Sequence, residues 1–420
     1  MNESKDGENV RRVLICCPDF EIGGFSSHAI NFGRAFRRLG CHVSCLVLEP
    51  FGKLYDEFLN SFDDIIIVRQ GLQSRNKFLR QVIQRVMQSQ PDVIINSAVP
   101  FVQAAFPYLP VEITRISVIH GMLEGKYEHE IDIASANAAW VDAVVAVSEN
   151  IRTVVLRRNL TGLRVVTIPV GMVEIPPLIP RVTVAKPLRL VFVGRLVRQK
   201  NLPGLLRVAQ QLYSIGIPFT LTVAGDGLEA AKFRRSVLAS GLINQIKILG
   251  PLTHNEIGKV FAQNDFFLMT SHYEGTPHTL LEAMAHGLIV LANRLPGSTD
   301  QIIAHGINGF LCNAAEPSSY IDTMQQLIGN PGLFAAVSEA ARLTIVKKYN
   351  ADALATDYAS LFGTMNTDPL RQSPHVYPCK DFRVADSLRP YCPGLARKIK
   401  HRIVGIWACM ACGKRSVTRR

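Results

Sequence analysis

The sequence predicts an α/β protein made of two Rossmann-like, doubly wound domains that face a central cleft. Three observations lead there: apolar stretches of strand length alternate with helical patterns, the alternation occurs in two successive series, and a proline-rich stretch separates them. Strands that are apolar throughout are typical of parallel sheets covered by helices on both faces. Ligands of such sheets bind outside the carboxyl ends of the strands, so two facing domains can share one pair of substrates.

The first series occupies residues 10–175, which we interpret as an N-terminal Rossmann-like domain. Its strands are rich in aliphatic residues, and helical patterns alternate with several of them. The predicted strands are 13–17, 42–48, 64–68, 93–97, 115–120, 143–148 and 165–169, with helices over 26–39, 78–88 and 149–158.

Residues 176–187 are predicted to link the two domains, because prolines cluster there without periodicity. The second series, over residues 188–348, forms a second Rossmann-like domain. A last helix falls within residues 349–364, and residues 365–420 form a tail rich in Pro, Arg, Lys and Cys. The strands predicted in the second domain are 188–193, 219–224, 246–249, 265–270, 289–293 and 309–312, with helices over 202–212, 228–239 and 318–328.

The net charge of +12 is concentrated in the tail. From Asn366 onward there are twelve Lys or Arg residues against three Asp, so the preceding residues are nearly balanced. Such a tail suits peripheral contact with an anionic membrane or glycolipid, and an unpartnered, solvated tail is an equal alternative. Nucleic acid is not expected as a partner, because no aromatic-interleaved basic motif is present.

The chain is expected to be cytoplasmic, with peripheral contact at the inner face of the membrane as an option. Its first twelve residues are polar, and no window contains 18 uninterrupted apolar residues. Disulfides are not expected in that compartment. The four tail cysteines could hold a structural zinc ion, although the first two are too far apart for a close ligand pair. They are Cys379, Cys392, Cys409 and Cys412.

Residues 271–287 read S-H-Y-E-G-T-P-H-T-L-L-E-A-M-A-H-G and follow an apolar run at 265–270. That run has the length and content of a buried parallel strand. Gly275 and Pro277 then interrupt regular structure, and the pattern that follows predicts a helix ending at Gly287. The segment is therefore predicted to be strand, turn and helix.

Two carboxylates flank the start of this helix, Glu274 in the turn and Glu282 inside the helix. Backbone N–H groups at the helix start, including those of Thr279 and Leu280, lie where the helix dipole favours an anion. A nucleotide-sugar matches both features, because its diphosphate suits the N–H groups and its vicinal hydroxyls can donate to carboxylates.

The pattern E-G-x-P-x-x-L-L-E-A-M-A-x-G resembles the E-x7-E signature of retaining glycosyltransferases with the GT-B fold, family 4 type (glycosyl transferases group 1). Two glutamates eight residues apart occur by chance in many proteins, and the strand and the breaks around them make the pattern specific. The resemblance implies that Glu282 holds the ribose hydroxyls and that Glu274 lies by the donor sugar. It also implies that the second domain holds the nucleotide-sugar and that the first domain presents the acceptor. The last helix is expected to pack back on the first domain.

The predicted strand 188–193 is followed by G-R-L-V-R-Q-K-N, which resembles the G-R-x4-K pattern of the same family. Arg195 and Lys200 in this loop can converge on one diphosphate, Arg as a planar fork and Lys as a point charge. The leaving nucleoside diphosphate gains negative charge during transfer, so such a clamp stabilises the transition state more than the ground state. Ordinary surface charges are the alternative.

The segment A-G-D-G-L-E-A at 224–230 also matches the G-x-G-x-x-A fingerprint of dinucleotide-binding proteins. Asp226 would place a negative charge near the pyrophosphate, and no acidic residue follows about 20 residues later. Family 4 transferases often carry G-D-G here, so we favour a tight turn near the nucleotide over a site for NAD.

Two features of the first domain complete the predicted site. Gly23 and Gly24 follow the first strand and could let the backbone approach the donor, with a plain turn as the alternative. His120 ends a strand whose carboxyl end should face the cleft, where a neutral imidazole can hydrogen-bond a sugar hydroxyl or polarise the reacting centre. A lone histidine there is usually structural, and the resemblance favours contact with the sugar. Three other histidines are interpreted as incidental: His272, His278 and His286.

Together these observations predict a glycosyltransferase that moves a sugar from a UDP- or GDP-linked donor to a glycan or lipid-linked acceptor, with retention of anomeric configuration. In the family's front-face route the leaving phosphate takes the acceptor's proton, so no separate base is needed. No D-x-D motif stands at a strand end, so neither a metal nor another cofactor is expected. Two alternatives stay open: another GT-B enzyme, such as an epimerase or a phosphorylase, and a non-catalytic nucleotide-sugar-binding protein.

Overall fold

The computed structural model describes residues 11–365, except 22, 98, 122–127, 159–162 and 178–179. Its first half is an alternation of strands and helices around one parallel sheet in the order β3-β2-β1-β4-β5-β6-β7. The elements are β1 (Arg12–Asp19), α1 (Gly24–Arg38), β2 (His42–Glu49), α2 (Tyr55–Ser61), β3 (Asp64–Ile67), α3 (Arg75–Gln88), β4 (Val93–Ser97), α4 (Pro100–Ala105), β5 (Thr114–Ile119), α5 (Glu128–Ala136), β6 (Ala143–Ala146), α6 (Glu149–Arg157) and β7 (Arg164–Thr167), with 3-10 turns at Phe106–Tyr108 and Ala138–Trp140.

The second half is built around a second parallel sheet in the order β10-β9-β8-β11-β12-β13. In both sheets the strand order runs outward in two directions from the first strand, which is the doubly wound arrangement. The predicted fold class is therefore confirmed. The elements are β8 (Leu188–Val193), a 3-10 turn at Arg198–Lys200, α7 (Leu202–Ser214), β9 (Phe219–Ala224), α8 (Ala230–Ala239), β10 (Ile246–Gly250), α9 (His254–Ala262), β11 (Phe266–Met269), α10 (His278–Ala285), β12 (Ile289–Asn293), α11 (Thr299–Ile302), β13 (Phe310–Cys312), α12 (Ser318–Ile328), α13 (Pro331–Lys348) and α14 (Ala351–Met365).

Successive residues of a strand face opposite sides of its sheet, and in β8 both sides are buried. Leu190 and Phe192 belong to a core confined to the second half, whereas Val191 and Val193 face the other way. The cluster that contains Val191 and Val193 continues into the first sheet and into α14. One apolar core therefore runs through both halves and fixes them against each other.

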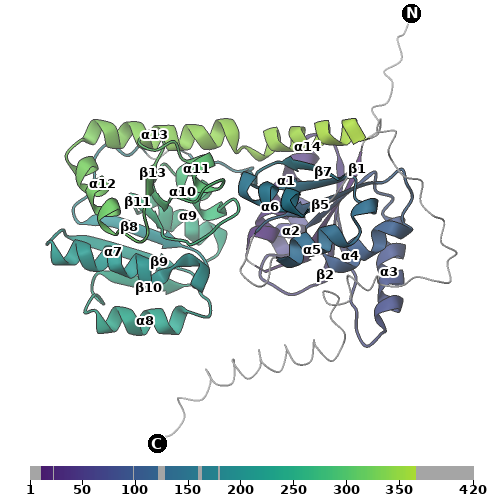
Figure 1. Cartoon of the computed structure of the whole chain (residues 1–420), viewed down its shortest axis with the longest axis horizontal. Helices are drawn as coiled ribbons and strands as arrows, with labels where there is room; N and C mark the ends of the chain where they lie inside the picture. The colour runs from purple at the N-terminus through teal and green to yellow at the C-terminus, as the bar shows by residue number, and fades with distance from the viewer. Residues whose placement is uncertain are drawn as a thin grey trace, which may run out of the picture.

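The chain passes between the halves at two places that lie side by side. The N–H of Met172 donates to the carbonyl of Tyr349 at 2.8 Å, and the N–H of Ala351 donates back to Met172 at 2.9 Å. A Cβ atom added to Gly171 would lie 2.8 Å from the Cα of Ala351, so this crossing leaves no room for a side chain. Figure 1 shows the result: α13 lies on the second half and α14 continues along the same edge onto the first.

Helix α14 is held on α1 by aromatic packing. The rings of Phe32 and Tyr358 lie 5.0 Å apart, and those of Phe36 and Phe362 are stacked at 5.9 Å. All four side chains are buried, and burying one such side chain contributes about 1.5–3 kcal/mol.

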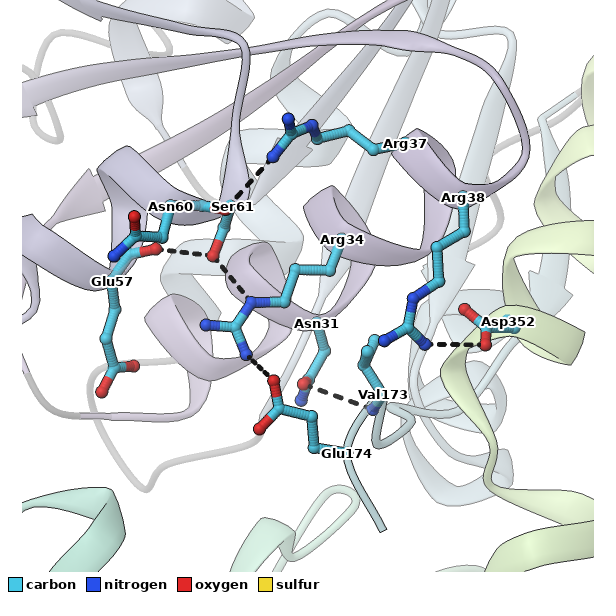
Figure 2. Close-up of polar contacts among 10 residues, drawn as sticks. All are labelled: Asn31, Arg34, Arg37, Arg38, Glu57, Asn60, Ser61, Val173, Glu174 and Asp352. Atoms are coloured by element: carbon cyan, nitrogen blue, oxygen red, sulfur yellow. Dashed lines mark hydrogen bonds and ion pairs between the residues drawn. The ribbon is translucent and has the colours of Figure 1, made fainter.

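Helix α1 also holds both crossings through charged side chains (Figure 2). Arg34 donates to the carboxylate of Glu174 at 2.7 Å, and Arg38 donates to Asp352, at the start of α14, at 3.0 Å. These partners are partly exposed, so each ion pair adds less than about 1 kcal/mol. Their contribution is to orient the crossing segments, while the apolar packing supplies the free energy.

The proline-rich segment is packed against the second half through a buried ion pair. Arg181 donates to the Asp265 carboxylate at 3.1 Å and to the carbonyl of Phe261 at 2.9 Å. Arg189 contacts the same carboxylate at 2.6 Å. The charge of Asp265 is thus compensated in a place where an unpaired carboxylate would be costly.

Candidate active site

The segment 271–287 forms the predicted strand, turn and helix. Strand β11 is fully buried, the turn follows at its carboxyl end, and α10 begins at His278. Glu274 in the turn and Glu282 in the helix are both buried, with 7% and 8% of their surface exposed. The strand pattern and the helix stop at Gly287 therefore predicted the local structure correctly.

Lys200 and Glu274 are brought together in an ion pair. The Lys200 Nζ lies 2.6 Å from Glu274 Oε1, and Gln199 donates to Glu274 Oε2 at 3.3 Å. Only 12% of the Lys200 side chain is exposed. The ammonium predicted to bind diphosphate therefore also contacts the carboxylate predicted to lie by the donor sugar.

Arg195 lies in the same loop but takes no part in this ion pair. Its side chain is exposed and makes no hydrogen bond or ion pair within the described part of the chain. The structure thus keeps one cation of the predicted pair, Lys200, engaged and leaves the other open to an anion.

The G-D-G segment at 225–227 packs against the loop 194–201, which carries Arg195 and Lys200 and is called the cation loop below. The N–H of Leu196 donates to the Asp226 carbonyl at 2.8 Å. Gly225 has φ +137, and a Cβ there would lie 1.9 Å from the carbonyl oxygen of Gly194. Glycine is thus required at 225 both for its φ and for the close approach, and the predicted tight turn is confirmed.

Asn201 anchors the end of the cation loop, which sequence reasoning missed. It adopts a left-handed conformation, with φ 51 and ψ 54, and its side chain accepts from the Gly204 N–H to cap α7. The same side chain donates to the carbonyl of Thr270 at 3.1 Å. The loop that carries Lys200 is thereby attached to the strand end that leads to Glu274. Asn directly before a Leu-Pro helix start was the available signal.

The start of α10 presents backbone N–H groups at the predicted place. Leu280 donates its N–H to the Pro277 carbonyl at 3.1 Å, so this amide is already engaged within the helix. The reason is that the chain turns tightly at Pro277 and closes a hydrogen bond within the first turn. Within the described residues, the amides of His278 and Thr279 make no main-chain hydrogen bond, and no side chain caps the helix.

Glu282 lies one turn inside α10 without a close cationic partner. The His254 ring lies beside it, with Nδ1 3.6 Å from Glu282 Oε1. Burial raises the pKa of the Glu282 carboxyl, and the neighbouring His254 opposes that rise. A desolvated carboxylate with unfilled acceptor positions is suited to hydroxyl donors.

His120 follows β5 and lies where the two halves meet. Its Nε2 is 3.3 Å from the Ser97 hydroxyl, and its backbone N–H donates to Glu130 at 2.7 Å. A Cβ added to Gly275 would lie 2.2 Å from the His120 carbonyl oxygen, so the signature turn contacts this strand end directly. The carboxyl ends of the two sheets therefore face each other.

Two more histidines surround His120, and sequence reasoning missed both. The His28 ring lies 4.6 Å from the His120 ring and is buried, with neither ring nitrogen hydrogen-bonded. The His278 ring lies 3.5 Å from where a Gly24 Cβ would be, whereas nothing lies within 4 Å at Gly23. His278 was interpreted as incidental because contacts between the halves leave no local pattern.

These three imidazoles are neutral at physiological pH. Burial lowers the pKa of His120 well below its usual value, and the neighbouring His28 and His278 lower it further. Burial likewise lowers the pKa of His28 to about 3 and that of His278 to about 4. Each ring therefore offers one N–H donor and one nitrogen acceptor.

The second half holds no recognisable metal centre in the part of the chain that the structure describes: no three His, Cys, Asp or Glu side chains are grouped as ligands. No helix of that part is long and apolar enough to cross a bilayer. The predicted basic tail and its cysteines, Cys379, Cys392, Cys409 and Cys412, lie outside the described residues.

Comparison with known proteins identifies the family. Residues 22–172 match the model of Glycosyltransferase Family 4, and residues 180–344 match that of Glycosyl transferases group 1. The solved structure of HepE from Anabaena, in complex with UDP and glucose, superposes with a TM-score of 0.68 at 17% identity, covering 84% of this chain and all of that one. The chain belongs to the GT-B glycosyltransferases.

Other structures and sequences agree with this assignment. This glycosyltransferase has the fold of sucrose-phosphate synthase from Thermosynechococcus elongatus, with a TM-score of 0.65 at 15% identity over 84% of this chain and 99% of that one. It is 28% identical over 151 residues to an uncharacterised glycosyltransferase of Haemophilus influenzae, and 24% identical over 174 residues to 2-deoxystreptamine N-acetyl-D-glucosaminyltransferase of Niallia circulans. These matches cover 36% and 41% of this chain, and 42% and 44% of the two relatives, less than half of their length.

Proposed function

We propose that this glycosyltransferase moves a sugar from a nucleotide-diphosphate sugar to a glycan or lipid-linked acceptor, with retention of anomeric configuration. The observation that carries the proposal is the Lys200–Glu274 pair, which lies beside the open start of α10, where the carboxyl ends of the two sheets meet. This is the place where doubly wound sheets bind their ligands.

The diphosphate would lie between the cation loop and α10. The Lys200 ammonium has three N–H bonds, so it can contact Glu274 and still donate to a phosphate oxygen. Arg195 adds an exposed guanidinium, and the amides of His278 and Thr279 add donors at the positive end of the helix dipole. These groups would stabilise the charge that develops on the leaving nucleoside diphosphate, without requiring a metal ion.

The two glutamates and His120 would orient the rest of the donor. Glu282, desolvated and with free acceptor positions, suits the two ribose hydroxyls. Glu274 can accept from a hydroxyl of the transferred sugar while Lys200 holds it in place. Neutral His120 can hydrogen-bond that sugar from the other half of the protein. Because burial lowers the pKa of these imidazoles, they are weak bases, and a front-face reaction would deliver the acceptor's proton to the leaving phosphate.

Transfer assays with a panel of UDP- and GDP-linked sugars test the proposal. The expected result is release of nucleoside diphosphate that depends on an acceptor, with the same anomeric configuration in product and donor by NMR. This release of nucleoside diphosphate should persist in the presence of EDTA. Epimerised donor without transfer would assign the chain to another class of nucleotide-sugar enzyme, and binding without turnover would make it a binding protein.

A further inference from the structure

Residues 147–151, the end of β6's loop and the first turn of α6, reach across from the first half and contact the loop of the second half that carries Glu274. The side chain of Asn150 donates to the Glu274 carbonyl at 3.0 Å, and its backbone N–H donates to the Gly297 carbonyl at 3.1 Å. From the other side, the Thr276 hydroxyl donates to the carbonyl of Val147. These three hydrogen bonds join one turn of the first half to two loops of the second.

The orientation of the Asn150 amide is determined by its own half. Its Oδ1 accepts from the hydroxyl of Ser148 and from the N–H of Ile151 at 2.9 Å. The oxygen is therefore occupied, and the NH2 group must face the Glu274 carbonyl, which can only accept. An aspartate of the same shape would keep both local contacts but would set an oxygen against an oxygen.

The contact is closely packed, and the loops it touches are joined to each other. A Cβ at Gly297 would lie 2.7 Å from the Asn150 nitrogen, and a Cβ at Gly275 would lie 3.0 Å from Ile151 Cδ1. Ser298 donates to the Gly275 carbonyl at 2.5 Å, so the two loops of the second half are joined to each other. A shift of the turn at 147–151 would therefore displace the backbone that carries Glu274.

We propose that Asn150 and Thr276 are positioning residues: they fasten the first half onto the signature loop and so set the backbone of Glu274 in its working geometry. This inference rests on the proposed function, because Glu274 is taken to contact the donor sugar. Neither residue needs to contact a substrate. Within the described residues, Lys200, Thr279 and Glu282 make no hydrogen bond to this turn and should bind nucleotide without it.

Two matched sets of variants test the inference. Asn150→Asp preserves shape and local contacts but removes the donor, and Thr276→Val removes the hydroxyl while Thr276→Ser keeps it. Arg157→Ala, at an exposed position on the same helix, is the control. We expect kcat to fall on the order of ten- to a hundred-fold in Asn150→Asp and Thr276→Val, the value of a lost buried hydrogen bond. Thr276→Ser and Arg157→Ala should stay close to wild type.

Two further readouts separate positioning from a merely structural role. The Kd of UDP or GDP, measured by calorimetry, should change less than about twofold in all four variants. The hydrogen bonds that Asn150→Asp and Thr276→Val remove join the two halves and lie away from the nucleotide. Small-angle scattering with bound nucleotide should show a larger radius of gyration for Asn150→Asp and Thr276→Val alone. The inference would be overturned if Asn150→Asp and Thr276→Val kept the radius of gyration and the kcat of the wild type. It would also be overturned if Thr276→Ser lost as much kcat as Thr276→Val. A wild-type protein that transfers no sugar would instead remove the proposed function, and the scattering comparison would still decide the contact.

Discussion

Replacing Lys200 with methionine removes its ammonium group while keeping most of the side chain. The Nζ lies 2.6 Å from Glu274 Oε1, and the two side chains are 12% and 7% exposed, so the variant leaves a carboxylate nearly buried without its cation. Breaking a buried pair in this way costs about 3–5 kcal/mol. Because Gln199 still donates to Glu274 at 3.3 Å, we expect the lower end, about 3 kcal/mol of unfolding free energy.

Glu274→Gln is the matched perturbation from the other side. A neutral amide oxygen can still accept from Lys200, so we expect a smaller loss of about 1–2 kcal/mol. The double variant Lys200→Met/Glu274→Gln should lose less than the sum of the two by about 1–3 kcal/mol, because the second change removes the uncompensated charge. Denaturant titration of the four proteins measures this coupling.

Activity separates the catalytic role of this pair from its contribution to stability. At a temperature where all variants are folded, Lys200→Met and Glu274→Gln should each lower kcat by about two to three orders of magnitude, the usual result of removing one group that stabilises transition-state charge. Additive losses of stability would show that the two side chains do not interact in solution. Wild-type turnover in Lys200→Met would refute its assignment to the leaving diphosphate.

Three further predictions concern the nucleotide, pH and the interface between the halves. Glu282→Gln should weaken UDP or GDP binding about ten- to a hundred-fold by calorimetry, as expected for hydrogen bonds to a charged group, and unchanged binding would remove its ribose role. Glu130 is 5% exposed and burial raises its pKa to about 8, so its protonated form is favoured by folding. This stabilisation is complete below the ordinary pKa near 4.5 and is lost as pH rises to 8, at up to about 1.4 kcal/mol per pKa unit. In denaturant titrations at pH 5 and pH 8, Glu130→Gln should lose less stability between the two than wild type, and equal losses would contradict the prediction. Phe362→Ala should cost about 3–5 kcal/mol of unfolding free energy, and a loss below 1 kcal/mol would show that α14 is not held by this packing.

Sequence alone determined the local structure of the chain and the chemistry carried by each loop. Continuous apolar strands predicted two parallel sheets, because only a strand buried on both faces lacks polar alternation. The order of Glu274, Gly275, Pro277 and Glu282 predicted a turn and a helix with two carboxylates. These properties depend on neighbours within a few residues, so they can be predicted from a short stretch.

The tertiary structure decided which of these groups meet. Lys200 and Glu274 are separated by 74 residues and Asn150 and Glu274 by 124, and no local pattern records either contact. His28 and His278 have ordinary surroundings in the sequence: packing within the first half places His28 beside His120, and the meeting of the two halves adds His278. The hydrogen bond that the Leu280 amide makes within the helix is likewise visible only in the folded chain. Local propensity determines what a segment becomes, whereas side-chain packing between distant segments determines what it contacts, and the active site depends on the second.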